Sequence, residues 1–257
     1  MDEIKLDSPP STLKTAVVIG ASGGLGAAIA RLLSQRPDIG VVLALSREKP
    51  ATRLPEGHEA GIQWLQADTA DQEDLQHAAR RIGATHDRVH LLINCTGTLH
   101  GGDADPAFKP EKALAELQLD NLERCMRVNA FAPLAALQAF APLLRHDEGA
   151  VAATLSAMVG SIGDNQLGGW HSYRMSKAAL NMGLRNVAIE FNRWRNSPVV
   201  VAIHPGTTLT ALSAPFVKRH KNRPPEESAR HILEVIDSLE AEDSGKFFHW
   251  DGHELPW

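Results

Sequence analysis

A short apolar strand that runs straight into a glycine-rich turn and a helix constrains the fold of this chain most. Residues 15–19 read Thr-Ala-Val-Val-Ile, residues 20–26 read Gly-Ala-Ser-Gly-Gly-Leu-Gly, and an alanine- and leucine-rich segment follows. β-branched apolar runs of this length are typical of strands buried on both faces. A glycine turn placed between such a strand and a helix lets the backbone approach a pyrophosphate, which the helix N-terminus favours electrostatically. The segment predicts a dinucleotide site, with a purely structural loop as the alternative.

The rest of the chain alternates strand-like and helix-like segments. Strands are expected at 15–20, 40–46, 61–67, 89–95, 149–156, 198–204 and 245–250, and helices at 24–36, 71–83, 111–145, 171–195 and 226–240. Such alternation builds a parallel sheet with helices on both faces, so we predict an α/β, single-domain Rossmann-type fold, three-layered and doubly wound. We expect one domain over 15–257, with a cofactor half over 15–150 and a catalytic half over 150–257, after a loose leader over 1–14.

Charge and composition narrow the class of protein. The net charge is −5 and no long basic stretch is present, which argues against nucleic acid as a partner. No apolar signal segment and no uninterrupted apolar run of membrane-spanning length occurs, so we expect a soluble, cytoplasmic protein. Cys95 and Cys125 both lie in apolar segments, as reduced core thiols do.

The only tyrosine of the chain, Tyr173, stands four residues before Lys177. On a helix these two side chains share a face. A nearby cation favours the phenolate and lowers the pKa of a tyrosine, so Tyr173 is expected to give or take a proton near neutral pH. Taken alone, the two residues could also be an ordinary surface pair.

Six motifs occur in an order that is known from one large family. They are Gly20 to Gly26, Asn94-Cys95-Thr96-Gly97, Asn129, Ser156, Tyr173 with Lys177, and Pro205-Gly206. Over residues 15–210 the chain therefore resembles the single-domain short-chain dehydrogenase/reductases. Within that family, residues 156–162, 168–170 and 250–252 look most similar to the C-factor and Sniffer-like carbonyl reductase branch.

The resemblance implies an NADP(H)-dependent oxidoreductase that transfers a hydride between nicotinamide and a small carbonyl or alcohol, assembled as a homodimer or homotetramer. It implies Tyr173 as general acid and base, and Lys177 as a ligand of the nicotinamide ribose. Asn129 would hold a water that connects Lys177 to solvent. Ser156 would polarise the carbonyl.

The position of that serine depends on the register. Counting from Gly149 places the hydroxyl at Ser156, whereas counting back from Gly160 places Ala157 there. We take Ser156, because an alanine would leave the developing oxyanion without this donor.

The same resemblance implies which residues line the cofactor site. They are Gly20, Ser22, Gly23, Gly24, Leu25, Gly26, Ser46, Arg47, Asp68, Thr69, Asn94, Thr96, Gly97, Tyr173, Lys177, Pro205, Gly206, Thr208 and Thr210. At the end of the second strand, Ser46 provides no carboxylate for a ribose 2′-hydroxyl, while Arg47 offers a guanidinium suited to a 2′-phosphate. NADP(H) is therefore expected to be preferred over NAD(H). The alternatives are that Arg47 begins a solvated loop and that Asp68 is only a turn residue.

Two further hypotheses concern a metal and a different class of function. His86/His90 and His249/His253 are spaced four apart, but neither pair has a third ligand at useful spacing, so no metal is expected. A dinucleotide-binding regulator or signalling protein of the C-factor type is the alternative to an enzyme. The presence of Tyr173, Lys177 and Asn129 favours the enzyme, since a nucleotide sensor needs no proton donor.

Overall fold

The computed structural model describes residues 13–48, 61–216 and 222–257; the expected leader lies outside them except for Leu13 and Lys14. The described residues form a seven-stranded parallel sheet in the order β3-β2-β1-β4-β5-β6-β7. The strands are β1 (Lys14–Ile19), β2 (Ile39–Ser46), β3 (Ile62–Gln66), β4 (Leu91–Asn94), β5 (Val151–Leu155), β6 (Val199–His204) and β7 (Phe247–His249). This order confirms the doubly wound α/β fold, since the chain moves outward from β1 first to one side and then to the other.

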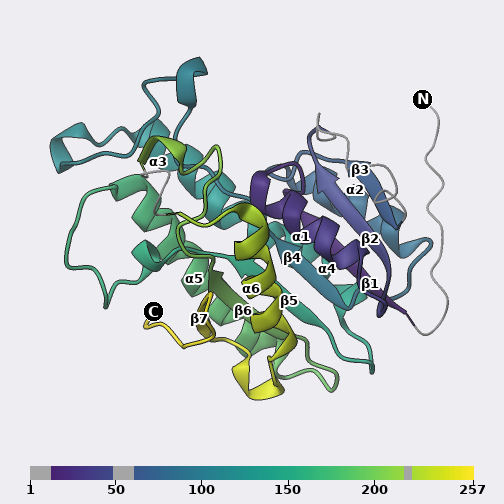
Figure 1. Ribbon diagram of the computed structural model, residues 1–257. Coiled ribbons are helices and arrows are strands. Elements are labelled where there is room, and N and C mark those ends of the chain that lie inside the picture. The colour runs from purple at the N-terminus through teal and green to yellow at the C-terminus, as the bar shows by residue number, and fades with distance from the viewer. Residues whose placement is uncertain (1–12, 49–60, 217–221) are drawn as a thin grey trace.

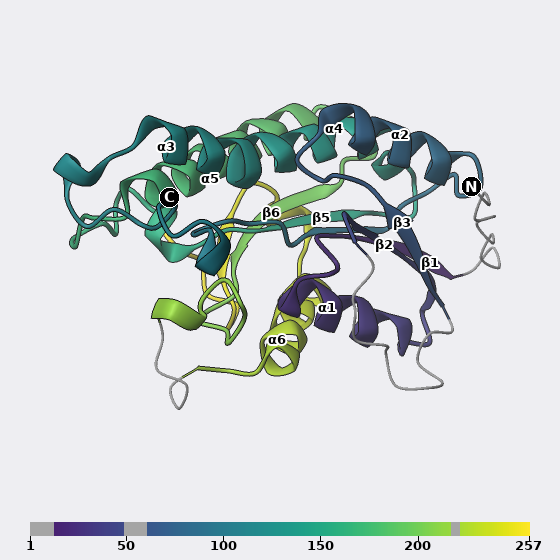
Figure 2. The ribbon, with the colours of Figure 1, turned by 90° about the horizontal axis from the view of Figure 1, so that it is seen from above.

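Helices cover both faces of the sheet, as Figures 1 and 2 show. One face carries α1 (Gly24–Ser34) and α6 (Pro225–Asp237), and the other carries α2 (Gln72–Gly83), α3 (Leu119–Met126), α4 (Ala132–Leu144) and α5 (His171–Phe191). Of the helices described, none combines the length and the apolar character needed to cross a membrane.

The sheet is buried on both sides because successive residues of each strand point to opposite faces. In β1, Val17 and Ile19 belong to the core under α2, α4 and α5, whereas Ala16 and Val18 belong to the core under α1 and α6. All four side chains are fully buried. An apolar run without polar alternation is what such a central parallel strand requires.

The helix expected over 111–145 is wrong at its start and irregular in its middle. Residues 111–118 contain only the short 3₁₀ turn Leu114–Glu116, and α3 begins at Leu119. Between α3 and α4 the helix widens into a π-helical turn over Arg127–Phe131, in which Asn129 is fully buried. A π turn inserts an extra residue per turn, and such turns are frequent at functional sites.

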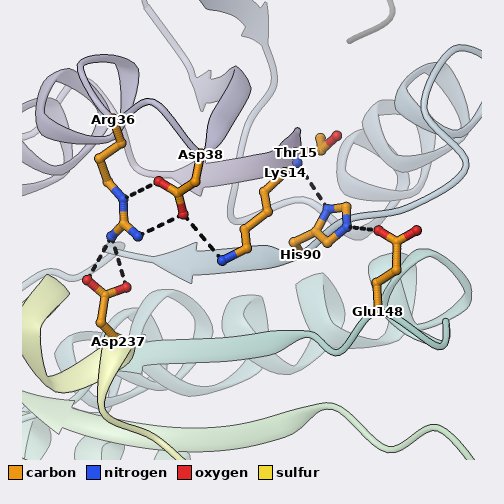
Figure 3. Close-up of polar contacts among 7 residues, drawn as sticks. All are labelled: Lys14, Thr15, Arg36, Asp38, His90, Glu148 and Asp237. Carbon is orange, nitrogen blue, oxygen red and sulfur yellow. Dashed lines mark hydrogen bonds and ion pairs between the residues drawn. The ribbon is translucent and has the colours of Figure 1, made fainter. Parts of the chain in front are cut away.

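Charged groups connect the elements around the N-terminal end of β1 (Figure 3). The Arg36 guanidinium donates to both carboxylate oxygens of Asp38, each at 2.9 Å, and also contacts Asp237 at the end of α6. Lys14 of β1 reaches the same Asp38 at 3.2 Å. These contacts join the loop after α1, the first residue of β1 and α6.

A buried histidine lies at the same end of β1 (Figure 3). The His90 Nδ1 atom accepts a hydrogen bond from the Thr15 amide at 3.0 Å, and its Nε2 atom lies 2.8 Å from Glu148. Burial lowers the pKa of His90 to about 4, so the ring is neutral at physiological pH, as its acceptor role at Nδ1 requires. This end of the sheet is built for stability and lies opposite the glycine turn.

Candidate active site

The glycine turn follows β1 at the carboxyl edge of the sheet. Gly20 adopts φ +78°, a conformation that other residues rarely reach. A Cβ atom on Gly26 would collide with the Gly20 carbonyl oxygen, so only glycine fits there. Gly23 precedes α1 without a capping side chain, and the first turn of that helix holds no acidic residue. The amide groups at this helix end therefore suit a phosphate, and the turn fits a dinucleotide.

The end of β4 lies beside the glycine turn. The Asn94 Oδ1 atom accepts from the Thr96 amide at 2.9 Å and from its hydroxyl at 2.7 Å, which orders the turn toward Gly97. Among the described residues, the buried Asn94 Nδ2 atom has no hydrogen-bond acceptor. An orphaned donor beside the glycine turn is consistent with a polar ligand at this edge of the sheet.

Side chains at the ends of β2 and β3 have specific local roles. The buried Ser46 hydroxyl donates to the Glu48 carbonyl at 2.7 Å, and Arg47 is exposed beside it. The exposed Asp68 accepts from the Ala70 amide at 3.0 Å through one carboxylate oxygen. Asp68 thus supports the local turn through one carboxylate oxygen, and Arg47 is the cation at the end of β2.

The turn after β6 packs against the same glycine-rich segment. Gly206 adopts φ +72°, and a Cβ placed on Gly24 would lie 3.3 Å from the Thr210 methyl group, so this turn packs against the start of α1. The Thr208 hydroxyl is buried and donates to Ser228 of α6 at 2.8 Å. Thr208 therefore fastens the turn to α6, while Thr210 lies beside Gly24 at the start of α1.

Helix α5 presents the proton-transfer pair. Tyr173, Lys177 and Asn181 occupy one stripe at spacings of four and are all buried, which confirms that the first two share a face. Asn181 was not expected from the motifs, although its position one turn further along the same stripe is the signal that could have revealed it.

The electrostatics of the pair differ from the expectation. Burial raises the pKa of Tyr173 above its usual value, whereas a lowered value was expected. Lys177 does not offset this effect, because its ammonium group donates to the Leu155 carbonyl at 2.9 Å, and burial lowers its own pKa to about 8. Tyr173 is therefore a neutral phenol at pH 7, the form that a proton donor needs.

Asn129 connects α5 to the loop after β4. Its Oδ1 atom accepts from the Thr98 amide at 2.7 Å, and its Nδ2 atom donates to the Thr98 carbonyl and to the Ser176 hydroxyl, both at 2.9 Å. The side-chain amide is thus committed to protein groups on both sides. It positions α5 against the loop, a role different from the water binding expected of it.

Ser156, which was expected to polarise a carbonyl, has a protein partner. Its buried hydroxyl donates to the Asn181 Oδ1 atom at 2.6 Å. Ala157 instead shares a small apolar cluster with Tyr173 and Leu99. Ser156 continues the β5 ladder through its amide, so residues 156 and 157 alternate sides and only one of them can face the tyrosine. These contacts favour the register that puts the Ala157 methyl group beside Tyr173.

A buried carboxylate holds the start of α5, which no motif indicated. Glu111 is 2% exposed, and it accepts hydrogen bonds from the Ser172 amide at 3.1 Å and from the Ser172 hydroxyl. Its main-chain carbonyl accepts from the Trp170 amide. Since Trp170 itself provides no capping side chain, Glu111 caps the helix that carries Tyr173. This contact also explains why residues 111–118 are not helical.

The wall around Tyr173 is apolar and aromatic. The cluster of Leu99, Ala157 and Tyr173 is extended by the partly buried Val159, Trp170 and Leu212. The Trp170 ring lies edge-on at 6.2 Å from Tyr173 and at 5.2 Å from Phe216. Trp170 has φ +50°, and no other described non-glycine residue has a positive φ.

The loop that follows this wall is anchored by Trp257. The Trp257 carbonyl accepts from the Ser161 hydroxyl at 2.9 Å and from the amides of Ile162 and Gly163 at 3.1 and 3.2 Å. Its ring stacks on Phe247 of β7.

Comparison with known proteins identifies the family. The family model described as short chain dehydrogenase matches residues 14–221. The chain belongs to the short-chain dehydrogenase family. A 1-hydroxy-2-glutathionyl-2-methyl-3-butene dehydrogenase of Rhodococcus sp. (strain AD45) is 30% identical over 247 residues, which are 95% of this chain and 100% of that protein. The C-signal of Myxococcus xanthus is 36% identical over 145 residues, 56% of this chain and 84% of that protein.

Solved structures share the architecture. The NADPH-bound carbonyl reductase from chicken fatty liver superposes with a TM-score of 0.80 at 26% identity, covering 95% of this chain and 99% of that one. The carbonyl reductase Sniffer of D. melanogaster has a TM-score of 0.79 at 20% identity, covering 95% and 100%. The C-signal match agrees with the resemblance to the C-factor branch, and the Sniffer structure shares the fold.

Proposed function

We propose that the protein is an NADP(H)-dependent carbonyl reductase or alcohol dehydrogenase in which Tyr173 is the general acid and base. The observation that carries the proposal is the buried stripe of Tyr173 and Lys177 on α5, which faces an apolar wall at the edge of the sheet that holds the glycine turn. A nicotinamide nucleotide bound there supplies or accepts the hydride.

The residues of this chain would then handle the proton. The neutral Tyr173 phenol would donate its proton to the alkoxide that forms when a carbonyl is reduced, which leaves a tyrosinate. In the reverse direction that tyrosinate would accept the proton of the alcohol and return to the phenol. Asn129 and Glu111 hold α5 from its two sides, which keeps the phenol in a fixed position. Because Ala157 lies beside Tyr173, the tyrosine hydroxyl is the principal donor that we assign to the substrate oxygen.

We assign the preference for NADP(H) to Arg47. It is the exposed cation at the end of β2, where Ser46 carries no charge that would repel a 2′-phosphate. The NADPH-bound carbonyl reductase from chicken fatty liver supports a nicotinamide cofactor at this fold position.

We infer a homodimer or homotetramer that uses the outer face of α4 and α5. Met182 and Ile189 of α5 are 63% and 46% exposed, and Phe131, in the π-helical turn that leads into α4, is 56% exposed. Large apolar side chains that gather on one exposed face favour a protein contact. Light scattering of the purified protein measures the mass of the assembly, and a monomer at micromolar concentration would contradict this inference.

The experiment that tests the function has two steps. NADPH and NADH are titrated into the protein, and turnover is then measured on a panel of aliphatic and aromatic aldehydes and ketones. Tight NADPH binding with turnover supports the reductase. NADPH binding with no turnover in either direction, on any carbonyl or on any alcohol, would instead support the nucleotide-binding regulator.

A further inference from the structure

The turn that follows β7 brings three metal-ligating side chains together. His249 is the last residue of β7, and Asp251 and His253 follow it at intervals of two. The Asp251 Oδ1 atom lies 2.8 Å from His249 Nδ1 and 2.5 Å from His253 Nδ1. The sequence pattern suggested no third ligand at useful spacing for the histidine pair. The tight turn supplies the ligand that a helix would not.

The backbone of this turn is ordered by its own hydrogen bonds. The His249 amide donates to the His253 carbonyl at 2.9 Å, and the Gly252 amide donates to the His249 carbonyl at 3.0 Å. Gly252 adopts φ +92°, which a residue with a Cβ rarely reaches. Phe248 pairs with Glu254 in an antiparallel bridge just outside the turn. The three side chains are therefore presented by a closed loop with little freedom at its base.

The His249 ring has a buried atom whose bonding is incomplete. Among the described residues, its Nδ1 atom is buried without a hydrogen-bond partner, although Asp251 Oδ1 lies at ion-pair distance. The contact thus has the distance of a hydrogen bond without its direction. Neighbouring rings restrict the imidazole, with His204 at 5.4 Å and Trp250 at 5.1 Å between ring centroids. A ligand that accepts the Nδ1 lone pair would satisfy this atom.

We propose that His249 Nδ1, Asp251 Oδ1 and His253 Nδ1 bind one Zn²⁺ ion. Two imidazole nitrogens and one carboxylate oxygen are a donor set that Zn²⁺ uses with bond lengths of about 2.0–2.2 Å, whereas Mg²⁺ and Ca²⁺ prefer oxygen alone. Three protein ligands leave the fourth tetrahedral position to water. Tetrahedral bonds of that length separate the donors by roughly 3.4 Å, so both contacts of Asp251 Oδ1 must lengthen. The side chains of Asp251 and His253 are 41% and 56% exposed and have the space to move outward.

The site stands behind the cofactor turn and does not touch Tyr173. His204, which packs on His249, directly precedes Pro205 and Gly206. Gly206 in turn packs against Trp250 and Arg223, whose guanidinium lies 3.5 Å over the Trp250 ring. A bound ion would therefore fix the wall on which the turn rests. Its effect is expected on stability, and it can be measured without any assay of turnover.

The test is calorimetric titration of ZnCl₂ into the full chain, freed of metal by a chelator and carrying no polyhistidine tag. We expect saturation at one ion per chain and a thermal unfolding midpoint that rises with free Zn²⁺. His253→Ala and Asp251→Asn should each weaken binding by at least the roughly 10–100-fold that loss of an outer-shell partner costs a metal site.

Two controls separate this site from general binding to the surface. His77→Ala removes an exposed histidine on α2, and Glu254→Gln removes the same charge as Asp251→Asn next to the turn. Both variants should bind Zn²⁺ as the unmodified chain does. Absence of saturable binding, unchanged affinity in His253→Ala and Asp251→Asn, or an equal loss in Glu254→Gln would each overturn the proposal. None of these outcomes bears on the proposed reductase activity.

Discussion

The glycine turn after β1 and the apolar wall around Tyr173 lie at the same edge of one sheet, yet they are built differently. The turn acts through the main chain, at positions such as Gly20 and Gly26 that tolerate no side chain. The surroundings of Tyr173 are formed by side chains from separate loops, among them Glu111, Ala157 and Trp170. A site made of backbone depends on the absence of Cβ atoms, whereas a site made of side chains depends on the direction of each one. If the register of the sequence is misjudged by one residue, the glycine turn is still recognised. The same error exchanges a hydroxyl for a methyl group beside Tyr173.

Removal of the phenol tests the side-chain region most strongly. Tyr173→Phe keeps the ring and its contacts with Trp170 but deletes the proton donor, so turnover should fall by about 10²–10⁴-fold. NADPH affinity, measured by fluorescence titration, should stay within a few-fold of the unmodified protein. Turnover that survives in Tyr173→Phe would mean that another group supplies the proton.

Addition of a hydroxyl beside the tyrosine is expected to increase activity. In Ala157→Ser a second donor would face the substrate oxygen, and since one oxyanion donor is worth about 10²–10³-fold in an optimised site, kcat/KM should rise by roughly 10–100-fold. Steady-state kinetics on the best carbonyl of the panel measures the change.

Ser156→Ala is the matched control for that substitution. It should leave kcat nearly unchanged but lower the free energy of unfolding by about 1–3 kcal/mol, because the buried Asn181 Oδ1 atom loses its donor. The opposite pattern, with Ser156→Ala inactive and Ala157→Ser neutral, would place the catalytic hydroxyl at Ser156 after all.

Two neighbouring glycines test the backbone region. Gly26→Ala forces a Cβ against the Gly20 carbonyl, and strain of about 1–3 kcal/mol should weaken NADPH binding by roughly 10–100-fold. Gly23→Ala places its Cβ 3.4 Å from the same oxygen, an ordinary contact, and should bind NADPH nearly as well as the unmodified chain. Equal NADPH affinities in the two variants would show that the backbone of the turn can move to accept a Cβ atom. The contrast between the glycine turn and the side chains around Tyr173 would then be weaker.

Lys177 should contribute to function at a cost to stability. Burial lowers its pKa from 10.5 to about 8, so at pH 7 the native state holds a buried cation, whereas between these pKa values the unfolded chain binds the extra proton and native stability rises with pH. Lys177→Met should raise the free energy of unfolding at pH 7 by about 1–3 kcal/mol while it abolishes turnover. The gain in the free energy of unfolding should be smaller than the pKa difference alone implies, because the Leu155 carbonyl loses its hydrogen-bond donor in Lys177→Met.

Urea denaturation of both proteins at several pH values checks this sign. The stability advantage of Lys177→Met should shrink as the pH rises from 8 toward 10.5, because the unmodified protein loses its buried charge over this interval. An advantage that grows with pH would contradict the assignment.

The smallest expected effect concerns coenzyme choice. Arg47→Asp should lower kcat/KM with NADPH relative to NADH by about tenfold, because a single exposed guanidinium contributes only part of the energy of a charged hydrogen bond. Glu48→Asp, next in the chain, is the control that changes the same loop without changing its charge. Equal efficiency with both nucleotides in the unmodified protein would refute the preference.

Local patterns predicted most of the fold but only part of the site. The apolar run before Gly20 and the spacing of Tyr173 and Lys177 are local signals, and the sheet order and the α5 stripe agree with them. The segment 111–118 was predicted as helix because its composition is helical, whereas Glu111 is drawn inward by Ser172, 61 residues away. Long-range contacts of this kind leave no periodic trace in a sequence.

Register and solvation explain the remaining differences. Ser156 and Ala157 are adjacent, so motif spacing could not decide which of them faces the phenol, and the alternation of the strand did. The pKa of Tyr173 was expected to fall because a cation lies one turn away, but burial outweighs a lysine whose ammonium group is bound to Leu155. Neither the depth of burial nor the rotamer of Lys177 can be predicted from spacing alone.

The hydrogen bonds of the Trp257 carbonyl connect residues 256–257 to the loop that leads to the apolar wall around Tyr173. This carbonyl accepts three hydrogen bonds from residues 161–163, and that loop connects the end of β5 to Trp170 and α5. Removal of Pro256 and Trp257 should therefore increase amide hydrogen exchange across 161–169 without changing exchange in β1 or α1. A change at residues 256–257 would thus act through the main chain on the loop that leads to Trp170 and Tyr173.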